Sequence, residues 1–284
     1  MLTLDAIAAY RAETYRTRQD LRVETKEEAI EHVNARGFVM FWPIKGVVMP
    51  SLWAAVAGSR VVPNEHDDPG HVIWGWKDSL LGKRSWYYGK VLRKKATMIS
   101  LAVVPYFYAL SENFGSPEDD YLTQYRDGTM TTEAKQIYAV LLREGSMNSP
   151  ALRRATSMTD KKANYRFNRG LTELQNDFKV LPIGVAEAGS WNYAFIYECT
   201  HRYHPEILEQ ATDIKIGEAR RELVTLYLRS VGAVQVSDVM KVFQWPKREM
   251  ERTIDALVES GTLVSGLEVE GQKGTWLSLP ELAE

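Results

Sequence analysis

The stretch from Thr159 to Cys199 reads TDKKANYRFNRGLTELQNDFKVLPIGVAEAGSWNYAFIYEC and contains two successive hydrophobic periodicities. Across residues 160–177, apolar side chains recur at steps of four and three, which places them on one face of an α-helix: Ala163, Phe167, Leu171 and Leu174. Apolar residues within 180–185 then indicate a strand, and a second strand has aromatics in strict alternation: Trp191, Tyr193, Phe195 and Tyr197. Between the two strands, Ala188-Gly189-Ser190 predicts a hairpin turn.

A second face of the same helix is basic. Lys162, Arg166 and Arg169 repeat at steps of four and three, Lys161 lies beside them, and Arg153 and Arg154 precede the helix. A basic helix followed by a hairpin is the layout of a winged helix, whose helix enters the major groove of DNA. We therefore predict that all six residues contact double-stranded DNA, mainly through phosphates. The alternative is a charged helix face that is merely solvated.

Composition limits the possible classes of protein. The chain has 284 residues, 45% of them apolar, and a formal net charge of −2, so any DNA site must arise from local segregation of charge. The single cysteine, Cys199, excludes an internal disulfide and a cysteine-rich metal site. No apolar run is long enough to span a membrane, and the N-terminus lacks signal-peptide features. We expect a cytoplasmic protein without membrane association, cofactor or metal.

Turn and helix signals divide the chain into three expected domains, and the expected fold class is mainly α with small β-hairpins (α+β), in tandem winged-helix domains. Residues 1–128 form an aromatic-rich, helical or winged-helix-like domain, in which Thr25 and Glu28 predict a capping box. Residues 129–213 contain the basic helix, the hairpin and a connector. Residues 214–284 repeat the same order of elements but carry 9 basic and 11 acidic residues, so the DNA contacts are predicted for the second domain.

A second basic segment lies between Ser79 and Ser100, where no acidic residue occurs. Its predicted DNA contacts are Lys90, Arg93, Lys94 and Lys95. The interleaved aromatics Trp86 and Tyr87 are candidates for stacking on bases. The alternative is that these two aromatic side chains belong to the core and the lysines are solvated.

Acidic residues cluster at Glu65-His66-Asp67-Asp68, with Asp78 ten residues further on. Carboxylates can position water, so Asp67, Asp68 and Asp78 are candidate catalytic residues. The alternative is a structured loop, because Asp-Asp-Pro-Gly favours turns, and the spacing fits no standard zinc site. Trp74 and Trp76 are interpreted as core residues, with a pocket for an extruded base as the alternative.

Several of these segments together resemble the AlkZ-related winged-helix proteins, which are distant relatives of the AlkZ and YcaQ DNA glycosylases. The resemblance covers nearly the whole chain and rests on the following stretches: Phe41-Trp42-Pro43-Ile44-Lys45-Gly46, Met49-Pro50-Ser51-Leu52-Trp53, His66-Asp67-Asp68-Pro69-Gly70, Trp74-Gly75-Trp76-Lys77-Asp78, Leu152-Arg153-Arg154, Leu171-Thr172-Glu173-Leu174-Gln175 and Phe178-Lys179-Val180-Leu181-Pro182. It implies tandem winged helices that cradle a DNA duplex on a concave basic surface.

The resemblance also implies a departure from the glycosylases, which carry a Gln-x-Gln or Gln-x-Asp motif. Met40 and Trp42 occupy the two motif positions here, and neither side chain can act as a base or offset positive charge. The leading hypothesis is therefore a winged-helix DNA-binding protein for damaged or structured DNA. The alternatives are a monofunctional glycosylase for alkylated or cross-linked bases, using the three aspartates, and a transcription regulator that senses a ligand through its N-terminal aromatics.

Overall fold

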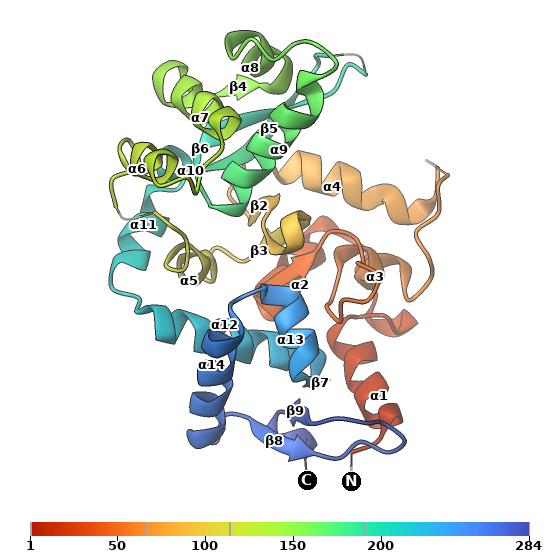
Figure 1. Cartoon of the computed structure of the whole chain (residues 1–284). Helices are drawn as coiled ribbons and strands as arrows, with labels where there is room; N and C mark the ends of the chain where they lie inside the picture. The colour runs from red at the N-terminus through yellow and green to blue at the C-terminus, as the bar shows by residue number, and fades with distance from the viewer. Residues whose placement is uncertain (1, 66, 114, 190, 284) are drawn as a thin grey trace.

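The computed structural model describes residues 2–65, 67–113, 115–189 and 191–283 (Figure 1). One order of elements recurs three times in it: a helix, a short strand, two helices and a two-stranded hairpin. The sequence predicted this order for the second and third segments, and the structure also has it in the first. We call the three repeats the first, second and third modules.

Each module contains a three-stranded antiparallel sheet in which the last strand lies between the other two. The elements of the first module are α2 (Lys26–Arg36), β1 (Phe38–Met40), α3 (Leu52–Ala57), α4 (Val72–Leu80), β2 (Tyr87–Lys90) and β3 (Ala96–Ile99). Those of the second are α7 (Thr132–Glu144), β4 (Met147–Asn148), α8 (Ser149–Ala155), α9 (Ala163–Asn176), β5 (Val180–Ala186) and β6 (Ala194–Cys199). Those of the third are α12 (Ile216–Val231), β7 (Ala233–Gln235), α13 (Val236–Phe243), α14 (Lys247–Glu259), β8 (Val264–Leu267) and β9 (Trp276–Ser278).

Short elements precede, connect and follow the modules. The α-helices among them are α1 (Leu4–Thr14), α5 (Val104–Tyr108), α6 (Asp120–Arg126), α10 (Thr200–Tyr203) and α11 (Pro205–Thr212). The 3-10 helices are η1 (Gln19–Leu21), η2 (Pro69–His71), η3 (Leu92–Lys94) and η4 (Pro280–Leu282). In the part of the chain that the structure describes, no helix is both long and apolar enough to cross a bilayer.

Helix α9 begins later than the periodicity predicted. The Asp160 carboxylate accepts a hydrogen bond from the Ala163 backbone amide at 2.8 Å, and the helix starts at that residue. The prediction that Lys161 and Lys162 lie on the basic helix face is therefore wrong, because both residues form the turn before α9. The helix itself and the hairpin are present, although Ser190 of the predicted turn lies outside the described residues.

The cores show how the modules are joined. The second module has a core of its own, centred on side chains such as Ile137 and Phe167 from α7 and α9. The first and third modules instead share a core in which Phe38 and Leu228 are both buried. Polar contacts reinforce this junction, since the Tyr227 hydroxyl donates to the Val48 carbonyl oxygen at 2.8 Å.

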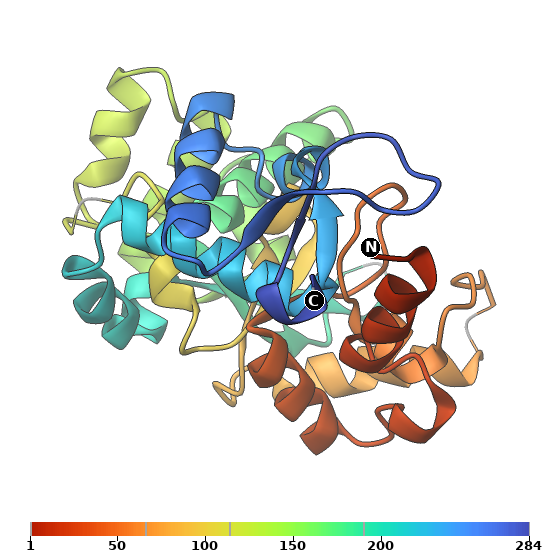
Figure 2. The ribbon, with the colours of Figure 1, turned by 90° about the horizontal axis from the view of Figure 1, so that it is seen from below.

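In Figure 1 the second module occupies the top of the view and the third the bottom, with the first between them. Figure 2 shows α1 beside the third module, to which it is tied by Arg11. The Arg11 guanidinium donates to the carbonyl oxygens of Val231 and Ala233, at 3.0 and 2.6 Å.

Candidate functional site

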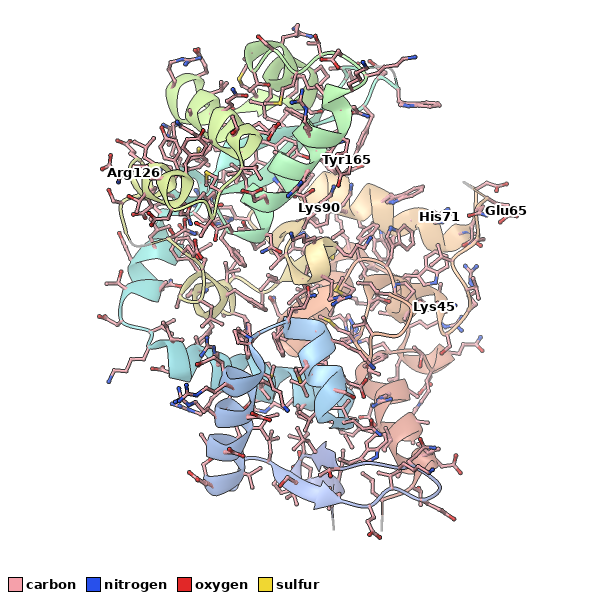
Figure 3. All side chains as sticks on the ribbon, in the orientation of Figure 1. Lys45, Glu65, His71, Lys90, Arg126 and Tyr165 are labelled. Carbon is pink, nitrogen blue, oxygen red and sulfur yellow. The ribbon has the colours of Figure 1, made fainter. Side chains whose placement is uncertain are left out.

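A groove of about 1080 Å³ separates α9 from η3 and brings the two basic segments of the sequence together. Lys94 and Lys95 line one side, and Arg169 lines the other, with uncharged side chains that follow the same face of α9: Tyr165, Asn168 and Thr172. Figure 3 shows Lys90 below Tyr165, and the Lys90 ammonium donates to the Thr172 hydroxyl at 3.5 Å. We call this feature the α9–η3 groove.

The backbone of η3 is held in an uncommon conformation. Arg93 and Lys94 have φ angles of 56° and 55°, the left-handed region that side chains other than glycine rarely adopt. Local hydrogen bonds hold the turn, because the amides of Lys94 and Lys95 donate to the carbonyls of Val91 and Leu92. Strained backbone of this kind is often found at functional sites.

The charges of the α9–η3 groove are not all basic. Glu173 is already engaged, since its carboxylate accepts from the Thr131 amide and hydroxyl, each at 2.8 Å. Glu133 lies 3.5 Å from the Arg166 guanidinium. Burial is the main cause of a lowered pKa at Lys90, and the nearby Lys95 charge adds to it. Lys94, Lys95 and Arg169 therefore supply most of the groove's positive charge.

Arg153 has a structural environment, unlike the other basic residues predicted from the second segment. Its guanidinium lies 4.2 Å from the Phe167 ring centroid and donates to Asn164 and Asn168 at 2.5 and 3.2 Å. Burial lowers its pKa. The remaining predicted contacts of this segment have exposed side chains: Arg154, Lys161, Lys162, Arg166 and Arg169.

Burial does not support the base-stacking prediction for Trp86 and Tyr87. Their exposed fractions are 4% and 0%, and the Tyr87 hydroxyl lies 3.4 Å from that of Thr200. The core alternative describes these two residues. The exposed aromatic in the α9–η3 groove is Tyr165, at 73%. Its signal in the sequence is the helical spacing that places it on one face with Arg169.

A separate aromatic pocket of about 420 Å³ lies between the first and second modules. Its lining comes from the end of β1, from α4, β2 and β3, and from the β6 hairpin: Phe41, Trp42, Trp74, Lys77, Asp78, Tyr88, Ala96, Tyr193 and Phe195. The Lys77 ammonium is 2.7 Å from the Asp78 carboxylate and 4.5 Å from the Phe195 ring centroid. Burial lowers the Lys77 pKa, while the Tyr193 hydroxyl donates to Asp78 at 2.9 Å.

The three candidate aspartates have different surroundings. Asp67 lies exposed in a loop, whereas Asp68 forms a two-pronged ion pair with Arg60 at 2.5 and 2.6 Å and accepts from the Gly70 amide. The hydrogen bond from Arg60 is the main cause that lowers the Asp68 pKa to about 2. Of the three, only Asp78 lines the aromatic pocket. His66 of the same cluster lies outside the described residues.

The two motif positions noted in the sequence have apolar surroundings. Met40 is 1% exposed and belongs to the core shared by the first and third modules. Trp42 lines the aromatic pocket, where its ring lies 5.7 Å from that of Trp74. Among the described residues, no three His, Cys, Asp or Glu side chains lie together as a metal site would require.

Comparison with known proteins agrees with this architecture. None of the curated proteins matches the chain. Among solved structures, the fold is similar to that of the Streptomyces sahachiroi DNA glycosylase AlkZ, with a TM-score of 0.57 and 13% sequence identity. That match covers 98% of this chain and 70% of the other. The model of the AlkZ-related family matches residues 23–244, which is most of the sequence, and the chain therefore belongs to the AlkZ-related family.

Proposed function

We propose that this protein binds double-stranded DNA in a role related to DNA repair, with the α9–η3 groove as the path of the phosphates. The observation that carries the proposal is the meeting of Lys94, Lys95 and Arg169 at one groove, although their segments are far apart in the sequence. Cations gathered along a groove bind nucleic acid by neutralising phosphates and releasing counterions. Membership of the AlkZ-related family and a fold shared with a protein described as a DNA glycosylase support the same partner.

We further infer that the second module is a winged helix, with α9 as its recognition helix and β5–β6 as its wing. The order of α7, α8, α9 and the hairpin supports this inference. The exposed side chains of Tyr165, Arg166 and Arg169 give α9 a polar and aromatic outer face suited to a DNA groove. Trp191, at the hairpin, is 90% exposed and is placed to contact the sugar–phosphate backbone.

The first test is fluorescence anisotropy with an undamaged duplex across a series of salt concentrations. If about six phosphates are contacted, the logarithm of affinity falls against the logarithm of salt with a slope of roughly −5. An affinity independent of salt would contradict the proposal. Strong preference for one operator sequence would instead favour a transcription regulator.

Charge-removing variants locate the contact. Lys95→Ala and Arg169→Ala should each weaken binding to every duplex and reduce the salt slope by about one, as expected for the loss of one phosphate contact. Lys247→Ala is the matched control, because that lysine is 75% exposed on α14 and pairs with Glu251 on its own helix. Equal effects of the three substitutions would place the DNA somewhere other than the α9–η3 groove.

The same samples test for base excision. We expect no abasic sites on N-alkylated DNA, because Met40 and Trp42 offer no polar atom suited to stabilise a sugar cation, and Asp68 is bound by Arg60. Alkali cleavage of the incubated duplex measures abasic sites directly. Base release that disappears in Asp78→Asn would support the glycosylase alternative and identify Asp78 as its carboxylate.

A further inference from the structure

We propose that the aromatic pocket binds a planar, amino-bearing nucleobase, and that Asp78 accepts a hydrogen bond from its amino group. The pocket has the walls that such a ring requires. Trp42 and Trp74 meet at a right angle with ring centroids 5.7 Å apart, and Trp74 also stacks on His71 at 4.7 Å. Because Trp74 is 37% exposed, its indole presents apolar surface to the entrance. Stacking on such rings is favourable for any base.

The polar side chains of the pocket provide direction. Oδ1 of Asp78 is bound to both the Lys77 ammonium and the Tyr193 hydroxyl, at 2.7 and 2.9 Å. Its other oxygen, Oδ2, has no hydrogen-bond partner among the described residues, although the side chain is 27% exposed. A carboxylate accepts and never donates, so it selects a ring edge that carries N–H groups.

The charges of the pocket also favour an uncharged ring. Lys77 and Asp78 neutralise one another, and the Lys77 ammonium already lies against the Phe195 and Tyr88 rings, at 4.5 and 5.6 Å from their centroids. A cationic ligand would have to compete with Lys77 for those ring faces. A neutral heteroaromatic ring instead uses the faces of Trp42 and Trp74, which remain on the open side of the pocket.

Two sources can supply such a base: a free nucleoside, or a nucleotide extruded from bound DNA. The second rests on the proposed function and has a structural route. Lys95 lines the α9–η3 groove and Ala96, the next residue, lines the aromatic pocket, so the two hollows meet at the start of β3. The first source is independent of DNA binding.

The experiment compares ring binding from both sources. Isothermal titration calorimetry measures the affinity for 2-aminopurine deoxyriboside and for unsubstituted purine deoxyriboside. Anisotropy measures binding to a duplex with 2-aminopurine in an unpaired position, beside its fully paired counterpart. Each measurement is made on the wild type, Trp74→Ala, Asp78→Asn and Trp191→Ala. Trp191 is the matched control, since it is an exposed tryptophan outside the pocket.

We expect Trp74→Ala to weaken binding of the amino-bearing ring about tenfold in at least one arm, with Trp191→Ala unchanged in the nucleoside arm. The wild type should prefer 2-aminopurine to purine, and Asp78→Asn should reduce that preference. An effect of Trp74→Ala specific to the unpaired base identifies DNA as the source. An effect confined to the deoxyriboside identifies a free nucleoside.

The proposal is overturned if Trp74→Ala alters neither arm, or if it weakens both duplexes equally and leaves the deoxyriboside unbound. Equal wild-type affinity for the two purines would overturn the role of Asp78. Failure of the proposed function gives a different result, namely no salt-dependent binding of the paired duplex. The deoxyriboside arm does not depend on that result.

Discussion

At the scale of single residues, Asp68 and Asp78 show how surroundings separate two carboxylates that the sequence treats alike. The Arg60 guanidinium and the Gly70 amide hold Asp68 ionised, with a pKa of about 2, and tie it to the start of η2. Such a group does not exchange protons near neutral pH. Asp78 instead faces an open pocket with one oxygen directed by Lys77 and Tyr193. Of the two, only Asp78 is placed to contact a ligand.

A pH prediction follows from His32 in α2. Its side chain is 1% exposed, and burial lowers its pKa from 6.5 to about 3. Between these values the unfolded chain binds a proton that the folded chain does not, so the free energy of unfolding falls as pH falls below about 6.5. Each pH unit in that window costs about 1.4 kcal/mol.

Urea denaturation at pH 7.5 and pH 5.0 measures this effect. Replacing the imidazole by the apolar side chain in His32→Leu should reduce the loss of stability between the two pH values by about 2 kcal/mol. The comparison is made within each protein, so a general cost of the substitution cancels. An unchanged pH dependence in the variant would mean that His32 is protonated in the fold.

At the scale of elements, two helical glycines have opposite roles. A Cβ at Gly170 of α9 would lie 2.8 Å from the Ala134 backbone nitrogen of α7, so this glycine permits the close approach of the two helices. A Cβ at Gly75 of α4 would meet nothing within 4 Å. Helix propensity alone favours alanine at both positions by about 1 kcal/mol.

We therefore expect Gly75→Ala to raise the free energy of unfolding by about 0.5–1 kcal/mol. Gly170→Ala should lower it, by about 1–3 kcal/mol, because α9 must shift away from α7. Chemical denaturation of the two variants measures both changes. Stabilisation by Gly170→Ala would show that the two helices do not pack as closely as the structure places them.

The ends of elements depend on contacts that periodicity does not record. The Thr25–Glu28 capping box is predicted from the sequence and present in the structure, since both of its hydrogen bonds join neighbours in the chain. The start of α9 was predicted three residues too early, because the apolar stripe marks the buried face of a helix and not its first residue. Asp160 sets the start through a side-chain bond to the Ala163 amide.

At the scale of the whole molecule, the shared core makes the first module dependent on the third. Phe38 and Met40 of β1 belong to one buried cluster with Leu223 and Leu228 of α12. Burial of each such side chain contributes about 1.5–3 kcal/mol. We expect a chain that ends at residue 213 to lose the fold of its first module and to aggregate.

Near-ultraviolet circular dichroism and light scattering measure that outcome. The second module should keep its helices in the shortened chain, because Ile137 and Phe167 belong to a separate core. A soluble shortened chain with the tryptophan signal of the full protein would show that the first module folds alone.

The sequence by itself determined the elements of the fold and the local segregation of charge. The periodicity of residues 160–199 predicted α9 and its hairpin, and the basic segments were identified from composition, because both properties depend on neighbours in the chain. Only the tertiary structure decided which residues share a site. It joined Lys95 to Arg169 across one groove, buried Tyr87 and opened Trp74 to a pocket. Such placements arise from packing between distant segments, and no local pattern encodes the distance between two elements that meet only in the fold.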